Sequence, residues 1–370
     1  MRVPKTSRQI EDRCQRTLAE QGSHGCMPGS ILADVQTLID FVGVKGLATG
    51  SKNSNLPAGV LPQLNCLLSQ PVELNLKRGL LKDYPNIGGV YALLRVMNLA
   101  RAEYEQIRIH PGALEVWSGL NPTEKYFALM EAWLIHADSN LAGVGQPDRR
   151  AQFDSNLDFL VNQASNSWQS YHEFFHTSPW DGLSTWNSQL QIRFGLFEAT
   201  PRPFQGRSYP TGGWMLGAGR RTPWGEAVAW SIYMHLLAKA KKEGQHTSKF
   251  IRCELPPEAG YGFLHSIFQP LFPEWRKMYA LAKRPVGPGL HIYKVGFDLR
   301  YGGGGVWRRL ALPHDASLHD LANAILAAFD FDNDHLYMIL YEKPMVVHVG
   351  VGRGRWPCLT RDESETKRFE

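Results

Sequence analysis

The hydrophobic pattern of the chain changes its period near residue 285, and this change constrains the fold more than any other feature. Before it, apolar residues recur at helical spacing, as from Ile31 to Val42. Residues 282–290, AKRPVGPGL, are rich in Pro and Gly and typical of a linker. After it, HIYKVGFDL and VWRRLAL alternate like the strands of a hairpin. ASLHDLANAILAAF has helical spacing, with Ser317 and Asp320 as a capping box and Leu318, Leu321, Ile325 and Phe329 expected to face inward. The pattern predicts an α+β protein whose mainly helical N-terminal part precedes a small C-terminal β-β-α-β module.

The regions of the chain follow from these changes of composition and period. A chain of 370 residues is longer than one ordinary core needs, so we expect several domains. The predicted regions are a mobile tail (1–29), a winged-helix-like helical domain (30–140), a second helical domain (150–283), an α+β module (290–341) and an irregular tail (342–370).

Residues 84–137 show the order of elements that is typical of a winged helix. NIGGVYALLRVMN predicts a helix, YEQIRI a strand and HPGALEVW the start of a further helix. Asn121 and Glu124 then form a capping box around Pro122, which predicts another helix start. A helix that reads DNA needs several cations for phosphate contacts, whereas residues 86–98 carry only Arg95. The segment therefore favours a structural or protein-binding use over DNA binding.

The second helical region contains two long predicted helices, over 153–177 and from Pro223 to about residue 243. Thr222 is the expected N-cap of the latter helix, which closes on a cluster of cations formed by Lys239, Lys241 and Lys242. Lysines suit the negative end of a helix dipole, so the cluster is explained by solvation. Phosphate contact is the alternative.

The stretch YHEFFH contains an H-E-x-x-H motif, formed by His172, Glu173 and His176. On a helix, residues four apart project from one face, so both imidazoles could bind one zinc ion while Glu173 activates its water. The histidines also lie at the edge of a predicted apolar face, where such rings commonly pack. Glu198 and Glu226 are available as a third ligand, but no helper motif surrounds them. We therefore expect a packing or capping role and keep a zinc-dependent hydrolase as the alternative.

Composition excludes several other classes of protein. No stretch approaches the roughly 18 apolar residues of a membrane span, and the N-terminus has no apolar signal-peptide core. The five cysteines are far apart and form no C-x-x-C pair, which argues against a disulfide framework. A net charge of +5 is too evenly spread to indicate a nucleic-acid stripe. These features predict a cytoplasmic protein with no membrane contact.

The C-terminal module resembles a known family. The residues that carry the likeness are Val306-Trp307-Arg308-Arg309 followed by LHDLANAILAAFDFDNDHLYMI, within 291–339. In order and spacing they resemble the plasmid pRiA4b ORF-3-like family, whose members are also described as insertion-element passenger proteins. FQPLFPEW, at 268–275, resembles the N-terminal region of longer members. The resemblance implies an α+β module of plasmids and mobile elements with no established activity.

The last 29 residues depart from that family pattern. Members usually continue into strands that carry a Tyr/Asp-Phe-Gly-Asp-x-Trp segment, and this segment is missing here. Gly350, Gly352 and Gly354 also speak against a strand. We therefore expect a truncation or frameshift after about Tyr341 that leaves the sheet with an unpaired edge.

The sequence as a whole predicts a non-catalytic accessory protein of plasmid or mobile-element type that binds protein or nucleic acid. The chain has no G-x-S-x-G, P-loop or dinucleotide motif, and no cofactor is expected apart from the zinc of the alternative. If nucleic acid binds, the predicted phosphate contacts are Lys239, Lys241, Lys242, Arg308 and Arg309.

Overall fold

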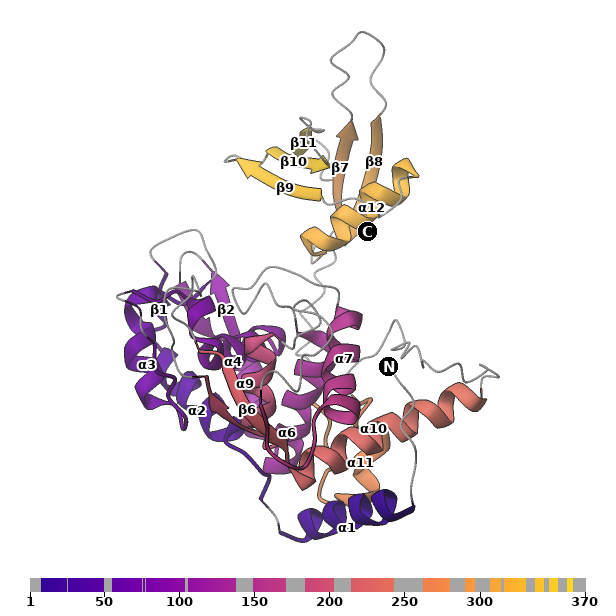
Figure 1. The fold of residues 1–370 in the computed structure, drawn as a ribbon. Coiled ribbons are helices and arrows are strands. Elements are labelled where there is room, and N and C mark those ends of the chain that lie inside the picture. Colours follow the sequence, from indigo (N-terminus) through magenta and orange to yellow (C-terminus); the bar gives the residue numbers. More distant parts are fainter. Residues whose placement is uncertain are drawn as a thin grey trace. The chain divides into compact units, whose positions relative to one another are not determined.

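The computed structural model describes most of the helical part and the main strands of the chain (Figure 1). The described residues are 8–24, 26–49, 55–74, 76, 78–103, 106–137, 149–170, 184–202, 214–242, 262–279, 290–296, 307–313, 316–330, 337–342, 346–351 and 358–361.

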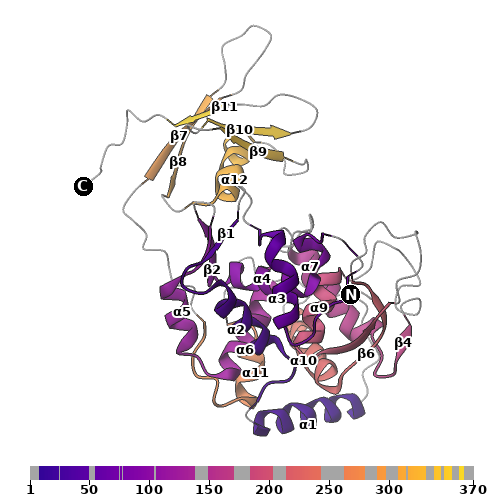
Figure 2. The same ribbon diagram turned by 90° about the vertical axis from the view of Figure 1, so that its left-hand side faces the viewer.

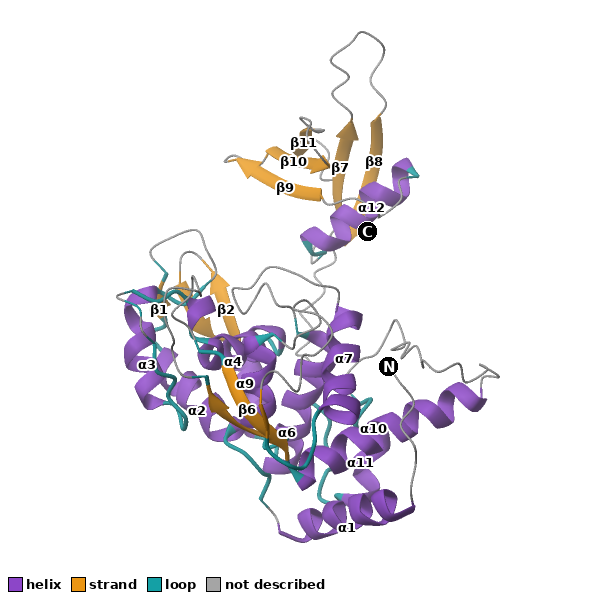
Figure 3. Ribbon diagram, viewed as in Figure 1, coloured by secondary structure: helices purple, strands orange, loops and turns teal. Residues whose placement is uncertain are grey.

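The chain forms two compact units, Met1–Ala282 and Lys283–Glu370. The first unit is mainly helical and the second combines a sheet with one helix, so the predicted α+β class is confirmed (Figure 3). The two helical domains predicted for 30–140 and 150–283 instead share one hydrophobic core in a single unit. The reason is that their central helices pack directly on each other, as described below.

The first half of the N-terminal unit is a helical group with a three-stranded antiparallel sheet. Its elements, in chain order, are α2 (Ile31–Val42), β1 (Leu47–Ala48), α3 (Leu61–Leu67), α4 (Pro85–Val96), β2 (Ala100–Glu103), β3 (Gln106–Ile109) and α5 (Pro111–Ser118). The sheet order is β1-β3-β2, so the first short strand pairs with the second strand of the hairpin. The helix, strand and helix predicted within 84–118 are therefore present.

The second half repeats this topology. Helices α6 (Pro122–Glu131) and α7 (Arg149–Asp158), each continued by a π-helical turn, precede β4 (Gln169–Ser170), α9 (Thr185–Arg193), β5 (Phe197–Pro201), β6 (Leu216–Arg221) and α10 (Pro223–Lys242). The sheet order is β4-β6-β5, again antiparallel, with the short first strand paired to the last. The sequence pattern did not reveal this repeat.

Local contacts at the ends of α4 and α9 support the equivalence of the two halves. Each helix is followed by a residue with positive φ, Asn98 at 58° and Gly195 at 67°. In both halves the residue after it is a buried Leu. The carbonyl of Leu99 accepts the backbone N–H of His110 at 2.9 Å, and the carbonyl of Leu196 accepts that of Thr222 at 3.1 Å. His110 and Thr222 directly precede the next helices, α5 and α10. The side chains of His110 and Thr222 cap these helices in the same way. His110 Nδ1 accepts a hydrogen bond from Ala113 N at 3.0 Å, and Thr222 Oγ1 accepts one from Gly225 N at 2.8 Å. The predicted cap Thr222 is confirmed.

Helices α4 and α9 pack against each other at the centre of the unit (Figure 2). All residues of α4 from Pro85 to Leu94 are buried. A Cβ at Gly89 would lie 2.9 Å from Leu190 Cγ, so glycine permits the close approach of the two helices. This seam joins the two halves into one core.

The N-terminal segment is a helix where a mobile tail was predicted. Helix α1 (Arg8–His24) packs along α10 and buries Cys14 and Leu18 (Figure 1). The prediction was wrong because Ile10, Cys14 and Leu18 recur every four residues and form a narrow apolar stripe in an otherwise polar segment.

Residues 262–279, which include α11 (His265–Phe268), bind to α6. The ring of Phe127 stacks on Trp275 with centroids 4.5 Å apart and on Phe268 at 5.1 Å. Glu124, the predicted capping-box residue, is confirmed in that role, and its second carboxylate oxygen accepts the backbone N–H of Arg276 and Lys277. The end of α6 is held likewise, because the Glu131 carboxylate accepts backbone bonds from the turn before α11.

The helix predicted for 153–177 ends earlier. After α7 and the turn Phe159–Gln163 the chain extends at Ala164, where ψ is 131°, and it continues into β4. Side-chain acceptors capture the next backbone donors, since Ser165 N bonds Gln169 Oε1 and Ser167 N bonds Ser165 Oγ. Such local bonds compete with the helical pattern, which explains the early end.

The C-terminal unit is a five-stranded antiparallel sheet with one helix packed on it (Figure 3). Its elements are β7 (Leu290–Gly296), β8 (Trp307–Pro313), α12 (Leu318–Phe329), β9 (Tyr337–Glu342), β10 (Val346–Val351) and β11 (Cys358–Arg361), in the sheet order β8-β7-β11-β10-β9. The capping box of Ser317 and Asp320 is confirmed. Leu321 and Ile325 are buried as predicted and Phe329 is half-buried, whereas Leu318, the first residue of the helix, is 53% exposed.

Strands β10 and β11 overturn the prediction of an irregular tail over 342–370. β11 lies between β7 and β10 in the sheet, and Gly350 pairs with Met338 inside a regular ladder. Val346, Val347, Val349 and Val351 have high strand propensity, which outweighs the single glycine among them.

No helix in the part of the chain that the structure describes is both long and apolar enough to cross a membrane.

Candidate functional site

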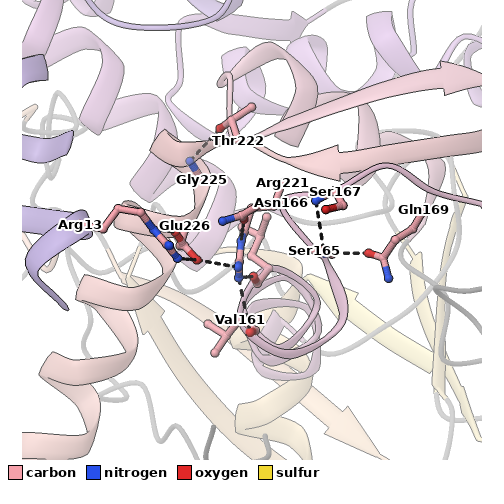
Figure 4. Close-up of polar contacts among 11 residues, drawn as sticks. Arg13, Val161, Ser165, Asn166, Ser167, Gln169, Arg221, Thr222, Gly225 and Glu226 are labelled. Carbon is pink, nitrogen blue, oxygen red and sulfur yellow. Dashed lines mark hydrogen bonds and ion pairs between the residues drawn. The ribbon is translucent and has the colours of Figure 1, made fainter. Parts of the chain in front are cut away.

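A cluster of charged side chains joins α1, β6 and α10 (Figure 4). The carboxylate of Glu226, in the first turn of α10, accepts two bonds from Arg13, from Nε and Nη2, both at 2.7 Å. Arg221, the last residue of β6, donates from Nη2 to the same carboxylate at 2.9 Å. Glu226 is buried, and two guanidinium groups neutralise its charge.

Arg221 also ties the cluster to the π-helical turn after α7. Its Nε donates to Asn166 Oδ1 at 3.0 Å (Figure 4). Its Nη1 donates to the carbonyl of Leu160, and its backbone N–H donates to Ser165 O. Burial lowers the pKa of Arg221, while the charge of Glu226 opposes this shift. These three bonds hold the end of β6 against the π-helical turn after α7 and the residues that follow it.

The neighbouring thiol of Cys14 is buried in the same region. Burial raises its pKa to about 11, and the charge of Glu226 adds to the shift. At neutral pH the group is therefore a protonated thiol, which is a poor nucleophile and metal ligand. The chemistry of the cluster is that of a packed ion pair that fixes helices.

A second ion pair lies at the seam between α2 and α9. Arg193 Nη1 and Asp34 Oδ2 are 3.2 Å apart, and both side chains are fully buried. The Arg193 guanidinium also donates to the carbonyl of Gln70 at 3.0 Å. Asp34 accepts bonds from Ser69 N and Ser30 Oγ, each at 2.8 Å. Sequence reasoning did not single out this pair, because nothing local distinguishes Arg193 from an exposed arginine.

The three residues of the zinc alternative, His172, Glu173 and His176, lie outside the described residues. Of the two carboxylates named as third ligands, Glu198 pairs with Arg220 at 2.7 Å and Glu226 is held by the two arginines above. Among the described side chains, no group of three or more His, Cys, Asp or Glu is arranged to hold a metal ion.

The predicted phosphate contacts lie in both units. Lys239, Lys241 and Lys242 occupy the last turn of α10, where Lys241 and Lys242 are exposed. Arg308 and Arg309 are exposed on β8, which is at one end of the sheet order. The three lysines belong to the first unit and the two arginines to the second.

The arginines of β8 contact aromatic rings. The Arg308 guanidinium carbon lies 5.4 Å from the centroid of Phe329, on α12, and that of Arg309 lies 6.0 Å from the centroid of Trp307. Trp307 is 50% exposed. Cation–π contacts of this kind orient the guanidinium groups.

Residues 291–367 match the family model of the Plasmid pRiA4b ORF-3-like protein. The resemblance predicted from the C-terminal module is thereby confirmed. The match covers β7 to β11 and extends well beyond Tyr341, so the expected loss of the module after that residue is wrong. No curated protein and no solved structure matches the chain.

Proposed function

We propose that the chain is a non-catalytic binding protein of plasmid or mobile-element type whose partner is another protein. The family match supports the mobile-element context. In this proposal the N-terminal unit consists of two winged-helix-like halves, since in each half a short first strand pairs with the last strand of a hairpin and a helix precedes that hairpin. In the second half, residues 171–183 lie outside the described part of this pattern.

The burial of α4 carries the proposal. In a winged helix that reads DNA, the helix before the hairpin enters the major groove and presents cations to phosphates. Here the equivalent helices, α4 and α9, face each other, and α4 is buried from Pro85 to Leu94. A helix that is already covered by its own chain cannot enter a groove. This supports a winged-helix-like unit that binds protein and not DNA.

The arginines of the second hairpin support the same conclusion. Arg220 pairs with Glu198 and lies 5.5 Å from the ring of Trp168, while Arg221 is committed to Glu226. Side chains that are bonded within the protein contribute little counterion release to nucleic-acid binding.

Nucleic-acid binding is the competing outcome, and anisotropy with labelled single- and double-stranded oligonucleotides at low salt distinguishes the two. The proposal predicts no saturable binding. It also predicts that cross-linking in the source cell identifies a partner protein. This partner and the chain, each purified, should then form a complex that resists nuclease treatment. Salt-dependent oligonucleotide binding that is lost on K239A/K241A/K242A or R308A/R309A would replace protein with nucleic acid as the partner.

The zinc hydrolase has its own test. Metal analysis of the purified protein at neutral pH should find no stoichiometric zinc. One zinc per chain that is lost on H172A and H176A, together with hydrolysis that requires Glu173, would overturn the non-catalytic assignment.

A further inference from the structure

The first half of the N-terminal unit contains a pocket of about 480 Å³ between α3 and the chain that leads into α4. This volume is within the roughly 300–1,000 Å³ of pockets that hold small molecules. Its described lining residues are Ala58, Gly59, Pro62, Asn65, Cys66, Val72, Leu74, Leu76, Arg78, Gly79 and Tyr84.

The lining combines an apolar wall with one positive charge. Arg78 is exposed, and no acidic residue is among the described lining residues. Two acids adjoin lining residues in the chain: Glu73 is exposed, and Asp83 uses its carboxylate to accept the backbone N–H of Leu80 at 2.8 Å. Tyr84 is the N-cap residue of α4, so the pocket also lies at the positive end of that helix dipole. The electrostatics of the pocket favour an anion.

The other polar lining residues differ in whether their side chains are used in hydrogen bonds within the fold. Asn65 is committed to the fold, since its amide bonds Val72 N and O and Asn86 Nδ2. Burial raises the pKa of the Tyr84 phenol, with contributions from Asp83 and Cys66, so it is a neutral hydroxyl at physiological pH. Cys66 is an exposed thiol in the same wall.

We propose that this pocket binds a small molecule with an apolar body and one anionic group, which pairs with Arg78 while the body packs on the Leu74 and Leu76 side. The site goes beyond the proposed protein-binding function and does not rest on it.

Two glycines define how the pocket can be altered. A Cβ at Gly79 would meet the Tyr84 ring at 2.6 Å, so this wall is already closely packed. A Cβ at Gly59 would meet no atom within 4 Å. Because Gly59 lines the pocket, Gly59→Phe adds a ring at its wall without a backbone clash, whereas a change at Gly79 would disturb the fold.

The test uses 2-naphthoate as probe and its neutral analogue 2-naphthamide as control. Each is added to the full chain, and alkylation of each cysteine by iodoacetamide is followed by peptide mass spectrometry. Cys26, which is exposed and is not among the described lining residues, is the internal control. Naphthoate should slow alkylation of Cys66 but not of Cys26, and naphthamide should protect Cys66 much less.

Variants identify the groups responsible. R78Q should weaken naphthoate binding about five-fold, the effect expected for one partly exposed ion pair, and leave naphthamide unchanged. R16Q, which removes an exposed arginine of α1, should have no effect. G59F should abolish protection while unfolding at the same temperature as the parent protein. Equal protection by both probes, equal protection of Cys26 and Cys66, no protection at millimolar naphthoate or an unaffected R78Q variant would each overturn the proposal.

Discussion

Helices α4 and α9 occupy equivalent places in the two halves of the N-terminal unit, yet they are buried by different means. The buried face of α4 is mostly apolar and includes Ile87, Val90 and Leu93. α9 buries five polar side chains, which are Asn187, Ser188, Gln189, Gln191 and Arg193. One topology therefore tolerates two kinds of helix.

The difference lies in how each helix is positioned. An apolar face packs against any complementary apolar surface, whereas a buried polar group is costly unless a specific partner meets it. Several of those in α9 have such partners, since Asn187 accepts the Trp133 indole N–H at 2.7 Å and Gln191 donates to Asn156 at 3.2 Å. We infer that α4 supplies most of the hydrophobic stabilisation and that α9 specifies how the halves meet.

The largest expected effect comes from Asp34→Ala, which leaves the Arg193 guanidinium buried without its anion. The free energy of unfolding from urea denaturation should fall by about 3–5 kcal/mol. Asp40→Ala is the matched control on the same helix, because Asp40 is exposed, and it should cost less than about 0.5 kcal/mol. The double variant D34L/R193M should recover most of the loss. Equal effects of D34A and D40A would show that the pair does not hold α9.

A buried acid that has no ionic partner within the described part of the chain should make stability depend on pH. Burial raises the pKa of Glu131 from the ordinary 4.5 to about 7, although backbone N–H donors oppose the shift. The folded state then holds the proton more tightly than the unfolded state, so stability is full below pH 4.5 and falls by about 3 kcal/mol as pH rises through 7. E131Q should flatten this slope, and the exposed control E115Q should retain it. A slope that persists in E131Q would assign the dependence to another group.

Gly89→Leu tests the apolar side of the comparison. Leucine is the better helix former, but its side chain would enter space that Leu190 occupies. We expect a loss of about 2 kcal/mol in unfolding free energy from overpacking. Gly59→Leu is the control, since a Cβ there meets open space. A G89L protein as stable as G59L would mean that the seam is loosely packed.

The smallest expected effect is at the exposed pair of Arg220 and Glu198. Their side chains are 41% and 48% exposed, so solvent screens the 2.7 Å contact. A double-mutant cycle with R220Q and E198Q should give a coupling below about 1 kcal/mol. A coupling free energy as large as the loss in D34A would show that burial does not explain the difference in strength between the Arg220–Glu198 and Asp34–Arg193 pairs.

The predictions that succeeded rest on local chemistry. The helix starts at Asn121, Thr222 and Ser317 were predicted from cap residues and are present, because a cap and the N–H groups it bonds are neighbours in sequence. The alternating strands of the C-terminal module and its family were also predicted, from period and motif order within one short segment.

The predictions that failed depended on distant partners. The segment that forms α1 was expected to be a mobile tail, because its narrow apolar stripe is buried only by packing against α10, which is far away in the sequence. The strands after Tyr341 were missed for a similar reason, since β11 is defined by the strands with which it pairs. The exception is the early end of the helix near Ala164, where side-chain acceptors bind the backbone N–H groups of Ser165 and Ser167 locally.

The sequence by itself determined the α+β class, the caps and the C-terminal family, because these follow from residues within a few positions of one another. Only the tertiary structure decided that α4 is covered by α9, that Arg193 meets Asp34 and that the two halves repeat one topology. Burial and ion pairing across more than a hundred residues depend on which surfaces meet, and no local pattern encodes that choice.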